Sequence, residues 1–199
     1  PGLGHATPIV WEDRIFVQTA VQTETVAEDA VEGRGSAPPY VYQYKVMALD
    51  RNAGTVIWEK TLREIHPHEG MHQTASFAST SGITDGELLY AFFGSQGLYC
   101  LDMDGNVQWE KDFGKMRTRN SFGEGTSPAI YGNTMVINWD QEDASFIVAL
   151  DKRTGKELWR NERDEVTSWS TPFIVEHQGV HQVIVSASAQ TKSYDLKTG

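Results

Sequence analysis

The chain has 199 residues, of which 39% are hydrophobic and 22% are charged, and its formal net charge is −10 at pH 7. This composition is typical of a globular protein, and the acidic balance argues against a nucleic-acid partner, which requires a basic face. No apolar run reaches the roughly 20 residues of a membrane span, and no signal-peptide pattern opens the chain. The single cysteine, Cys100, excludes a disulfide within the chain.

Short runs of β-forming residues follow one another and predict strands in a fixed order. A Ser or Thr followed by Pro or Gly opens the first strand of each group, where proline costs no ladder hydrogen bond. These openings lie at residues 7–10, 81–83, 127–130 and 171–175. Second strands are expected at 14–19, 88–93, 135–139 and 182–186, and third strands at 42–49, 97–101, 146–150 and 191–196. No segment has a helical period, so the predicted fold class is all-β.

A motif recurs at the end of each third strand. It reads ALDRNAGTVIW at 48–58, CLDMDGNVQW at 100–109 and ALDKRTGKELW at 149–159, and a fourth copy starts at Ser193 as SYDLKTG. In each copy an aspartate can accept hydrogen bonds from turn amides, and a glycine supplies the positive φ of a tight turn. A repeat of about 50 residues built from short strands indicates a β-propeller with one blade per repeat.

The pattern A-x-D-x-x-T-G-x-x-x-W resembles the tryptophan-docking motif of the pyrroloquinoline-quinone-type (PQQ-like) β-propeller repeat family. In that family the tryptophan of one blade packs on the neighbouring blade. The second copy departs from the pattern at Cys100 and in its shorter turn. The matching residues are Ala48, Asp50, Gly54, Trp58, Asp102, Gly105, Trp109, Ala149, Asp151, Gly155, Trp159 and Asp195. The resemblance implies a propeller of four-stranded antiparallel blades, of which this chain holds about three and a half.

The repeats place the blades at about residues 4–62, 72–113, 125–163 and 168–199, the last of them incomplete. An arc of this length leaves blade edges unpaired, so we expect an open part of a ring of roughly six to eight blades. Residues 21–40 interrupt the first blade with an acidic, proline-containing stretch. Its low apolar content favours a mobile surface insertion over a docking arm. Residues 140–145, DQEDAS, lack the ligand spacing of a calcium loop, and a solvated acidic loop is expected there.

Two sets of residues are candidates for binding. His66, His68 and His72 fall within seven residues and are weak candidates for a zinc or copper site, with a polar inter-blade loop as the favoured interpretation. The links 114–127 and 160–171 end at first strands and should lie where loops meet the central channel. A binding site at this channel mouth is weighed evenly against inter-blade salt bridges with Trp169 packed as core. The channel-mouth candidates are Arg117, Arg119, Asn120, Glu124 and Trp169.

The resemblance implies two branches of function. Quinone-dependent dehydrogenases of this architecture carry a vicinal cysteine pair, a calcium ligand set and a catalytic aspartate, whereas this chain has one cysteine. The non-catalytic branch includes periplasmic lipoproteins that scaffold outer-membrane protein assembly, and secreted or surface proteins. We therefore favour a non-enzymatic bacterial scaffold, periplasmic, secreted or at the cell surface, without cofactor or catalytic residues, that binds a protein or small ligand at the channel mouth. The alternatives are a fragment of a divergent PQQ-dependent quinoprotein dehydrogenase and a carbohydrate- or metal-binding module.

Overall fold

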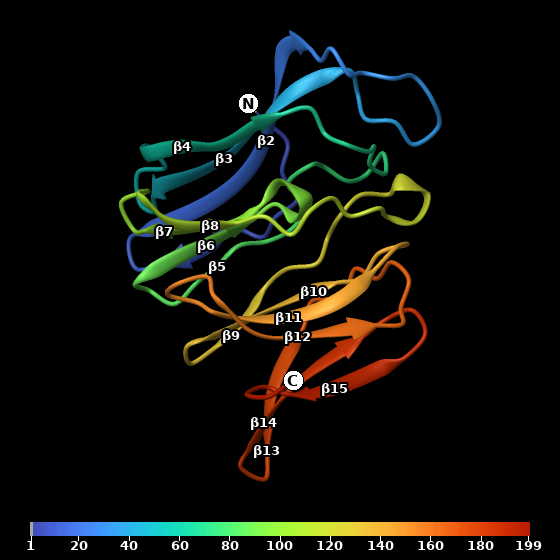
Figure 1. Ribbon diagram of the computed structural model, residues 1–199. Coiled ribbons are helices and arrows are strands. Elements are labelled where there is room, and N and C mark those ends of the chain that lie inside the picture. The colour runs from blue at the N-terminus through green and yellow to red at the C-terminus, as the bar shows by residue number, and fades with distance from the viewer. Residues whose placement is uncertain (1) are drawn as a thin grey trace. The chain divides into compact units, whose positions relative to one another are not determined.

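The computed structural model describes residues 2–199, which form two compact units (Figure 1). The first unit contains residues 2–115 and 120–124, and the second contains residues 116–119 and 125–199. Each unit consists of two antiparallel sheets whose strands are neighbours in sequence order. This arrangement confirms the predicted all-β class and the blade-like sheets of a partial propeller. Within residues 2–199 no helix has the length and apolar character needed to cross a membrane.

The first unit holds two four-stranded sheets. The strands of one sheet are β1 (Ile9–Trp11), β2 (Arg14–Val26), β3 (Tyr40–Asp50) and β4 (Val56–Ile65). The strands of the other are β5 (Ile83–Thr84), β6 (Leu88–Phe92), β7 (Leu98–Asp102) and β8 (Val107–Lys111), with the 3-10 turn η1 (Gly94–Gln96) between β6 and β7. Alternate residues of β3, from Tyr42 to Ala48, are buried, and they form one core cluster with Leu89 and Ala91 of β6. The period-2 pattern of β3 therefore packs one sheet on the next.

The second unit holds a four-stranded and a three-stranded sheet, in yellow to red in Figure 1. The strands of the first are β9 (Ala129–Tyr131), β10 (Thr134–Trp139), β11 (Ser145–Asp151) and β12 (Glu157–Arg163). The strands of the second are β13 (Phe173–His177), β14 (Val180–Ser186) and β15 (Thr191–Asp195). Val136, Ile147 and Ala149 of one sheet share a core cluster with Val183 and Val185 of the other. The short segment η2 (Arg119–Ser121) belongs to the connection between the units.

The repeated motif produces the same backbone irregularity three times. A register shift, the sign of a β-bulge, lies after the motif's first residue, between Ala48 and Leu49, between Cys100 and Leu101, and between Ala149 and Leu150. That first residue is fully buried in each copy and is paired across the ladder with the motif's tryptophan. A small side chain is therefore required opposite each indole, and Cys100 satisfies this as alanine does.

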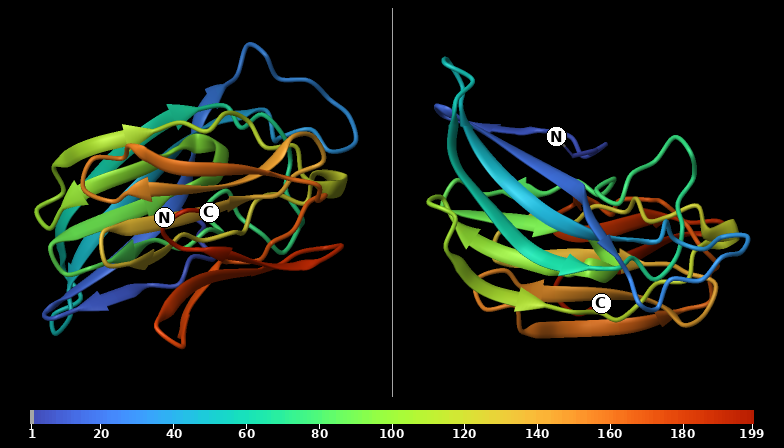
Figure 2. Two further views of the ribbon diagram at one scale, coloured as in Figure 1. Left: turned by 60° about the horizontal axis from the view of Figure 1, so that its bottom comes forward. Right: turned by 90° about the horizontal axis from the view of Figure 1, so that it is seen from above.

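The insertion at 21–40 is more ordered than the sequence predicted. Strand β2 continues to Val26, because the β-branched residues of VQTETV favour an extended ribbon with β3. The remaining loop, residues 27–39, extends beyond the ends of β2 and β3 (Figure 2). It is fixed to the segment after β4, since Gly70 N donates to Gly35 O at 2.8 Å. His66 contacts the same loop, with Nδ1 2.8 Å from Asp29 Oδ1 and Nε2 3.0 Å from Pro38 O. These contacts hold the insertion to its own unit, and the two interpretations of it, a mobile surface insertion and a docking arm, stay predictions.

Antiparallel order places the connections after the second and fourth strands at one end of each sheet. We call this end the loop edge of each unit. In the first unit it comprises residues 27–39, 66–82, 93–97 and 120–124, and in the second unit residues 140–144, 164–172 and 187–190. The binding residues predicted from the sequence lie in these segments or beside them.

Candidate functional site

Two of the motif tryptophans, Trp58 and Trp159, lie against the turn of the following repeat. In the first unit Trp58 Nε1 donates to Met103 O at 3.0 Å, and a Cβ on Gly105 would lie 3.0 Å from the indole ring. In the second unit Trp159 Nε1 donates to Leu196 O at 3.0 Å, and its ring lies in the same way over Gly199. Glycine is therefore required at this turn position for two reasons, the positive φ of the backbone and the close approach of the indole.

The motif aspartates organise their own turns. Asp50 Oδ1 accepts from Asn52 N and Ala53 N, and Asp195 Oδ1 accepts from Lys197 N and Thr198 N. The backbone hydrogen bonds from Thr198 and Lys197 hold the pKa of Asp195 below its ordinary value. Asp102 and Asp151 also have lowered pKa values, because turn hydrogen bonds outweigh the cost of burial. These carboxylates have a structural task at the edge opposite the loop edge.

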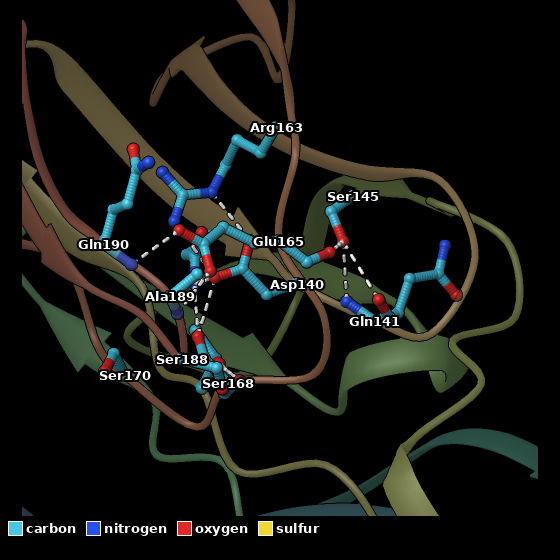
Figure 3. Close-up of polar contacts among 12 residues, drawn as sticks. Asp140, Gln141, Ser145, Arg163, Glu165, Ser168, Ser170, Ser188, Ala189 and Gln190 are labelled. Atoms are coloured by element: carbon cyan, nitrogen blue, oxygen red, sulfur yellow. Dashed lines mark hydrogen bonds and ion pairs between the residues drawn. The ribbon is translucent and has the colours of Figure 1, made fainter.

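A buried ion pair lies at the centre of the second unit's loop edge (Figure 3). Arg163 Nε donates to Asp140 Oδ1 at 2.6 Å and Nη2 donates to Oδ2 at 3.1 Å, and both side chains are fully buried. Burial alone lowers the pKa of Arg163, but the hydrogen bonds to Asp140 outweigh this and hold the pKa above its ordinary value. Arg163 Nη1 also donates to Tyr194 Oη. The bidentate geometry satisfies both charges where water has no access.

Neighbouring polar groups complete this arrangement, which we call the Asp140 network: Asp140, Arg163, Tyr194, Ser168 and Asn138. Ser168 Oγ donates to Asp140 Oδ2 at 2.7 Å, and Asn138 Nδ2 donates to the same oxygen at 3.0 Å. The network joins the ends of β10 and β12 to β15 and to the loop 164–172. The prediction of a solvated acidic loop at 140–145 is wrong for Asp140. An arginine 23 positions away removes it from solvent.

Three further carboxylates fix the same loops. Glu165 accepts from Ala189 N at 2.9 Å and Gln190 N at 3.1 Å, so it holds the 187–190 turn to the 164–172 loop (Figure 3). Glu142 Oε1 accepts from Thr167 N at 3.2 Å and Thr167 Oγ1 at 2.8 Å. Asp143 pairs with Arg117 at the surface. Four of the five acidic side chains at this edge are thereby engaged in loop structure, and the fifth, Asp164, is exposed.

The channel-mouth candidates separate into the two units. Arg117, Arg119 and Trp169 belong to the second unit, whereas Asn120 and Glu124 belong to the first. Arg117 Nη2 lies 2.8 Å from Asp143 Oδ1, and Arg119 N donates to Thr167 Oγ1 at 2.9 Å. Trp169 is 44% exposed and packs on Gly125, where a Cβ would lie 3.1 Å from the indole.

The three histidines occupy separate environments within the first unit. His66 contacts the 27–39 loop, and His72 Nδ1 lies 2.8 Å from Thr74 Oγ1 with its ring edge-on to Phe122. His68 lines a cavity together with Glu124. Within residues 2–199 no three histidine, cysteine, aspartate or glutamate side chains gather closely enough to hold a metal ion.

Sequence reasoning did not find Arg163 or Tyr194 as partners of Asp140. Arg163 ends a strand rich in charged residues, and no local signal distinguishes it from its exposed neighbours Arg160 and Glu162. What places Arg163 in the buried face is the strand register of β12 on β11. Arg163 pairs with Ser145 at the buried end of β11, so it lies on the inward face.

Repeats, sheets and docked tryptophans together define a β-propeller-type protein of PQQ-like repeats. A family model described as "Outer membrane protein assembly factor BamB" matches residues 2–122 and 42–199. The chain belongs to this family. Among the curated proteins none matches the sequence significantly.

Solved structures from both branches of the repeat family resemble the chain. BamB from Moraxella catarrhalis has a TM-score of 0.52 at 18% identity, over 98% of this chain and 59% of that one. The quinohemoprotein alcohol dehydrogenase ADHIIG of Pseudomonas putida HK5 has a TM-score of 0.58 at 14% identity, over 100% of this chain and 33% of that one. The quinohemoprotein alcohol dehydrogenase of Comamonas testosteroni has a TM-score of 0.52 at 15% identity, over 81% of this chain and 21% of that one. The chain thus spans less than two thirds of each, and identities this low show the fold alone.

Proposed function

We propose that the chain is part of a non-enzymatic propeller scaffold that binds a protein partner through the loop edge, in an extracytoplasmic bacterial setting. The observation that carries this proposal is the use of four acidic side chains at the loop edge of the second unit. These carboxylates accept hydrogen bonds or form ion pairs that hold loops in place, and they belong to Asp140, Glu142, Asp143 and Glu165. Carboxylates committed in this way stiffen a surface, whereas acid–base catalysis needs a carboxyl that is placed against a substrate.

The stiffened loop presents apolar side chains to solvent. Val166 and Trp169 are each 44% exposed, on a loop anchored by buried Thr167 and Ser168 between them. A preordered loop loses little conformational entropy on binding, and a tryptophan is the residue type most enriched among binding hot spots. Val166 and Trp169 are therefore the proposed contact residues of the second unit.

The docked tryptophans support the scaffold role by joining sheet to sheet. Trp58 and Trp159 each connect a fourth strand to the turn of the next repeat. Rigid sheets with loops collected at one edge form the usual platform for recognition in propellers. We infer that this docking holds the loop edge in a single shape.

The similarity to quinohemoprotein dehydrogenases, with a TM-score of 0.58 for one of them, makes a quinoprotein the alternative function. The chain's single cysteine is not placed for redox chemistry on a quinone. Cys100 is fully buried in β7, and burial, with smaller contributions from Asp85 and Asp102, raises its pKa to about 12. A thiol with that pKa stays protonated and packed.

Site-specific photocrosslinking in cells tests the scaffold proposal. A photoreactive amino acid at position 169 should crosslink to a protein partner, for which outer-membrane assembly proteins are the first candidates, given the family's name. The matched control position is Leu158, which is 53% exposed in the same unit but lies on β12, away from the loop edge. Equal crosslinking from both positions, or quinone-dependent alcohol oxidation by the purified protein, would contradict the proposal.

A further inference from the structure

A small cavity lined by polar and aromatic side chains lies beneath the loop edge of the first unit. Its volume is about 30 Å³, and it is enclosed by side chains from β3, from the 66–80 segment, from the η1 turn and from the 120–124 segment. The residues that define its chemistry are Tyr44, Glu69, Phe77, Phe93, Gln96 and Glu124. At roughly 10–15 Å³ for each water-sized group, the space holds about two such groups.

The carboxylate of Glu124 is built into the wall of this cavity. Glu124 Oε2 accepts from Ser95 N at 2.7 Å. Gly94 precedes Ser95 with φ +57, and a Cβ on Gly94 would overlap the Glu124 carboxylate. The turn therefore needs glycine both for its backbone and to leave space for this acid. Such a fit distinguishes Glu124 from a surface glutamate that reaches the site by chance.

Tyr44 provides a second, independent sign of a ligand. Its side chain is fully buried, and among residues 2–199 its hydroxyl has no hydrogen-bond partner. A buried hydroxyl without a partner is costly, at about 1–3 kcal/mol, and calls for an explanation. Tyr44 lines the cavity with Glu124, and burial followed by the charge of Glu124 raises the Tyr44 pKa. The hydroxyl therefore stays protonated and can donate or accept.

The cavity is complementary to a positive charge. Glu69, Glu124 and His68 line it, and no lysine or arginine is among the described lining residues. Phe77 and Phe93 supply aromatic rings, whose faces attract cations. Burial raises the pKa of Glu124 to about 7. The hydrogen bonds from Ser95 oppose this rise, and the negative charge of Glu69 adds to it. A cation in the cavity would relieve this cost by stabilising the ionised form.

We propose that this cavity binds a primary ammonium group. The nitrogen and its attached carbon match the room for about two water-sized groups. An ammonium has three donors, which suit the Glu124 carboxylate, the Tyr44 hydroxyl and the Gln96 amide oxygen. The group belongs either to a free small amine or to a lysine side chain. Gly70 and Met71 line both the cavity and an open groove of about 540 Å³ along the 30–39 loop, through which a lysine could enter.

This site lies entirely in the first unit and does not depend on the scaffold role of the second. Its test is calorimetric titration and thermal shift of the purified protein with methylammonium chloride, against equal sodium chloride. We expect saturable binding and a rise in melting temperature. Nα-acetyl-lysine amide forms a second arm. Binding of methylammonium alone indicates a free amine, and binding of both indicates that a partner's lysine fits.

Variants separate the site from non-specific charge effects. Glu124→Gln keeps an oxygen for Ser95 N but removes the charge, and should weaken methylammonium binding about tenfold or more. Gly94→Ala should weaken it as well, by displacing the carboxylate, while the exposed Glu110→Gln should leave it unchanged. Tetramethylammonium, which exceeds the space, should not bind. Binding should weaken about tenfold per pH unit below 7, where Glu124 is protonated. The other titratable groups at the cavity are His68, Glu69 and Tyr44, and the charge of Arg63 acts on Tyr44.

Three results would overturn the proposal. The first is the absence of any saturable methylammonium effect. The second is equal binding by wild type and Glu124→Gln. The third is an equal thermal shift from tetramethylammonium or from calcium, since either would show that size or ammonium chemistry does not matter.

Discussion

Both units consist of two antiparallel sheets, but the buried polar groups at their loop edges differ in how far protein atoms satisfy them. In the second unit the buried charge of Asp140 is matched by Arg163, Ser168 and Asn138, and protein atoms fill this network except at Asn138 Oδ1, which has no hydrogen-bond partner among residues 2–199. In the first unit Glu124 and the Tyr44 hydroxyl border a cavity that protein atoms do not fill. A filled network gives stability and a fixed surface, whereas an unfilled one leaves bonding capacity for a ligand. The contrast assigns structure to one edge and binding of a small group to the other.

Breaking the filled network should give the largest effect. Arg163→Ala leaves Asp140 buried without its counter-ion, and we expect a loss of about 3–5 kcal/mol in the free energy of unfolding of the second unit. Urea denaturation measures it. The matched control is Arg160→Ala, whose partner Glu157 is partly exposed, and which should cost less than about 1 kcal/mol. Similar losses for both variants would show that the Asp140 network is not the source of stability.

The docked tryptophans sharpen the comparison because they are equivalent in the two units. Trp58→Ala and Trp159→Ala should each cost about 3 kcal/mol, since each removes a large packed ring and a hydrogen bond to the next repeat. Trp11, which is 40% exposed, should cost clearly less when changed to alanine. Chemical denaturation with fluorescence from the remaining tryptophans measures the three variants. Small and equal losses would contradict the docking role.

Local features of the sequence predicted the fold because turn chemistry and strand alternation act over a few residues. The motif glycines and aspartates place each hairpin, and the small residue opposite each tryptophan follows from the ladder. The sites depend on contacts between distant positions. Glu124 meets Ser95 and Gly94 across 29 or more positions, and Asp140 meets Arg163 across 23. No pattern of residue types encodes these pairs, which is why Asp140 was expected in solvent and Glu124 was named only as one of several loop residues.

Titration offers a third comparison, because the raised and lowered pKa values act in opposite directions. The pKa of Glu124 is about 7 in the folded protein, above its ordinary value of 4.5, so the folded state binds the extra proton. Stability should therefore be full below about pH 4.5 and fall by about 1–2 kcal/mol as pH rises to 7. Asp195 has a lowered pKa, so it stabilises the folded state at pH values above its ordinary pKa, and this stability is lost as the pH falls. Urea midpoints across this range should show the Glu124 slope in wild type and not in Glu124→Gln.

The smallest expected effect concerns the loop 27–39. Both neighbours of the His66 ring, Asp29 Oδ1 and Pro38 O, are acceptors, so both bonds form together only when both ring nitrogens carry protons. Asp29 is 80% exposed at its side chain, and His66→Ala should cost less than about 1 kcal/mol in unfolding. Its effect on the loop should be local. Trypsin should cleave after Arg34 severalfold faster in the variant, because proteolysis of a native loop follows its opening. His177→Ala, a change in the second unit, is the control. Unchanged cleavage at Arg34 would mean that contacts other than His66, such as the Gly35–Gly70 hydrogen bond, hold the insertion in place.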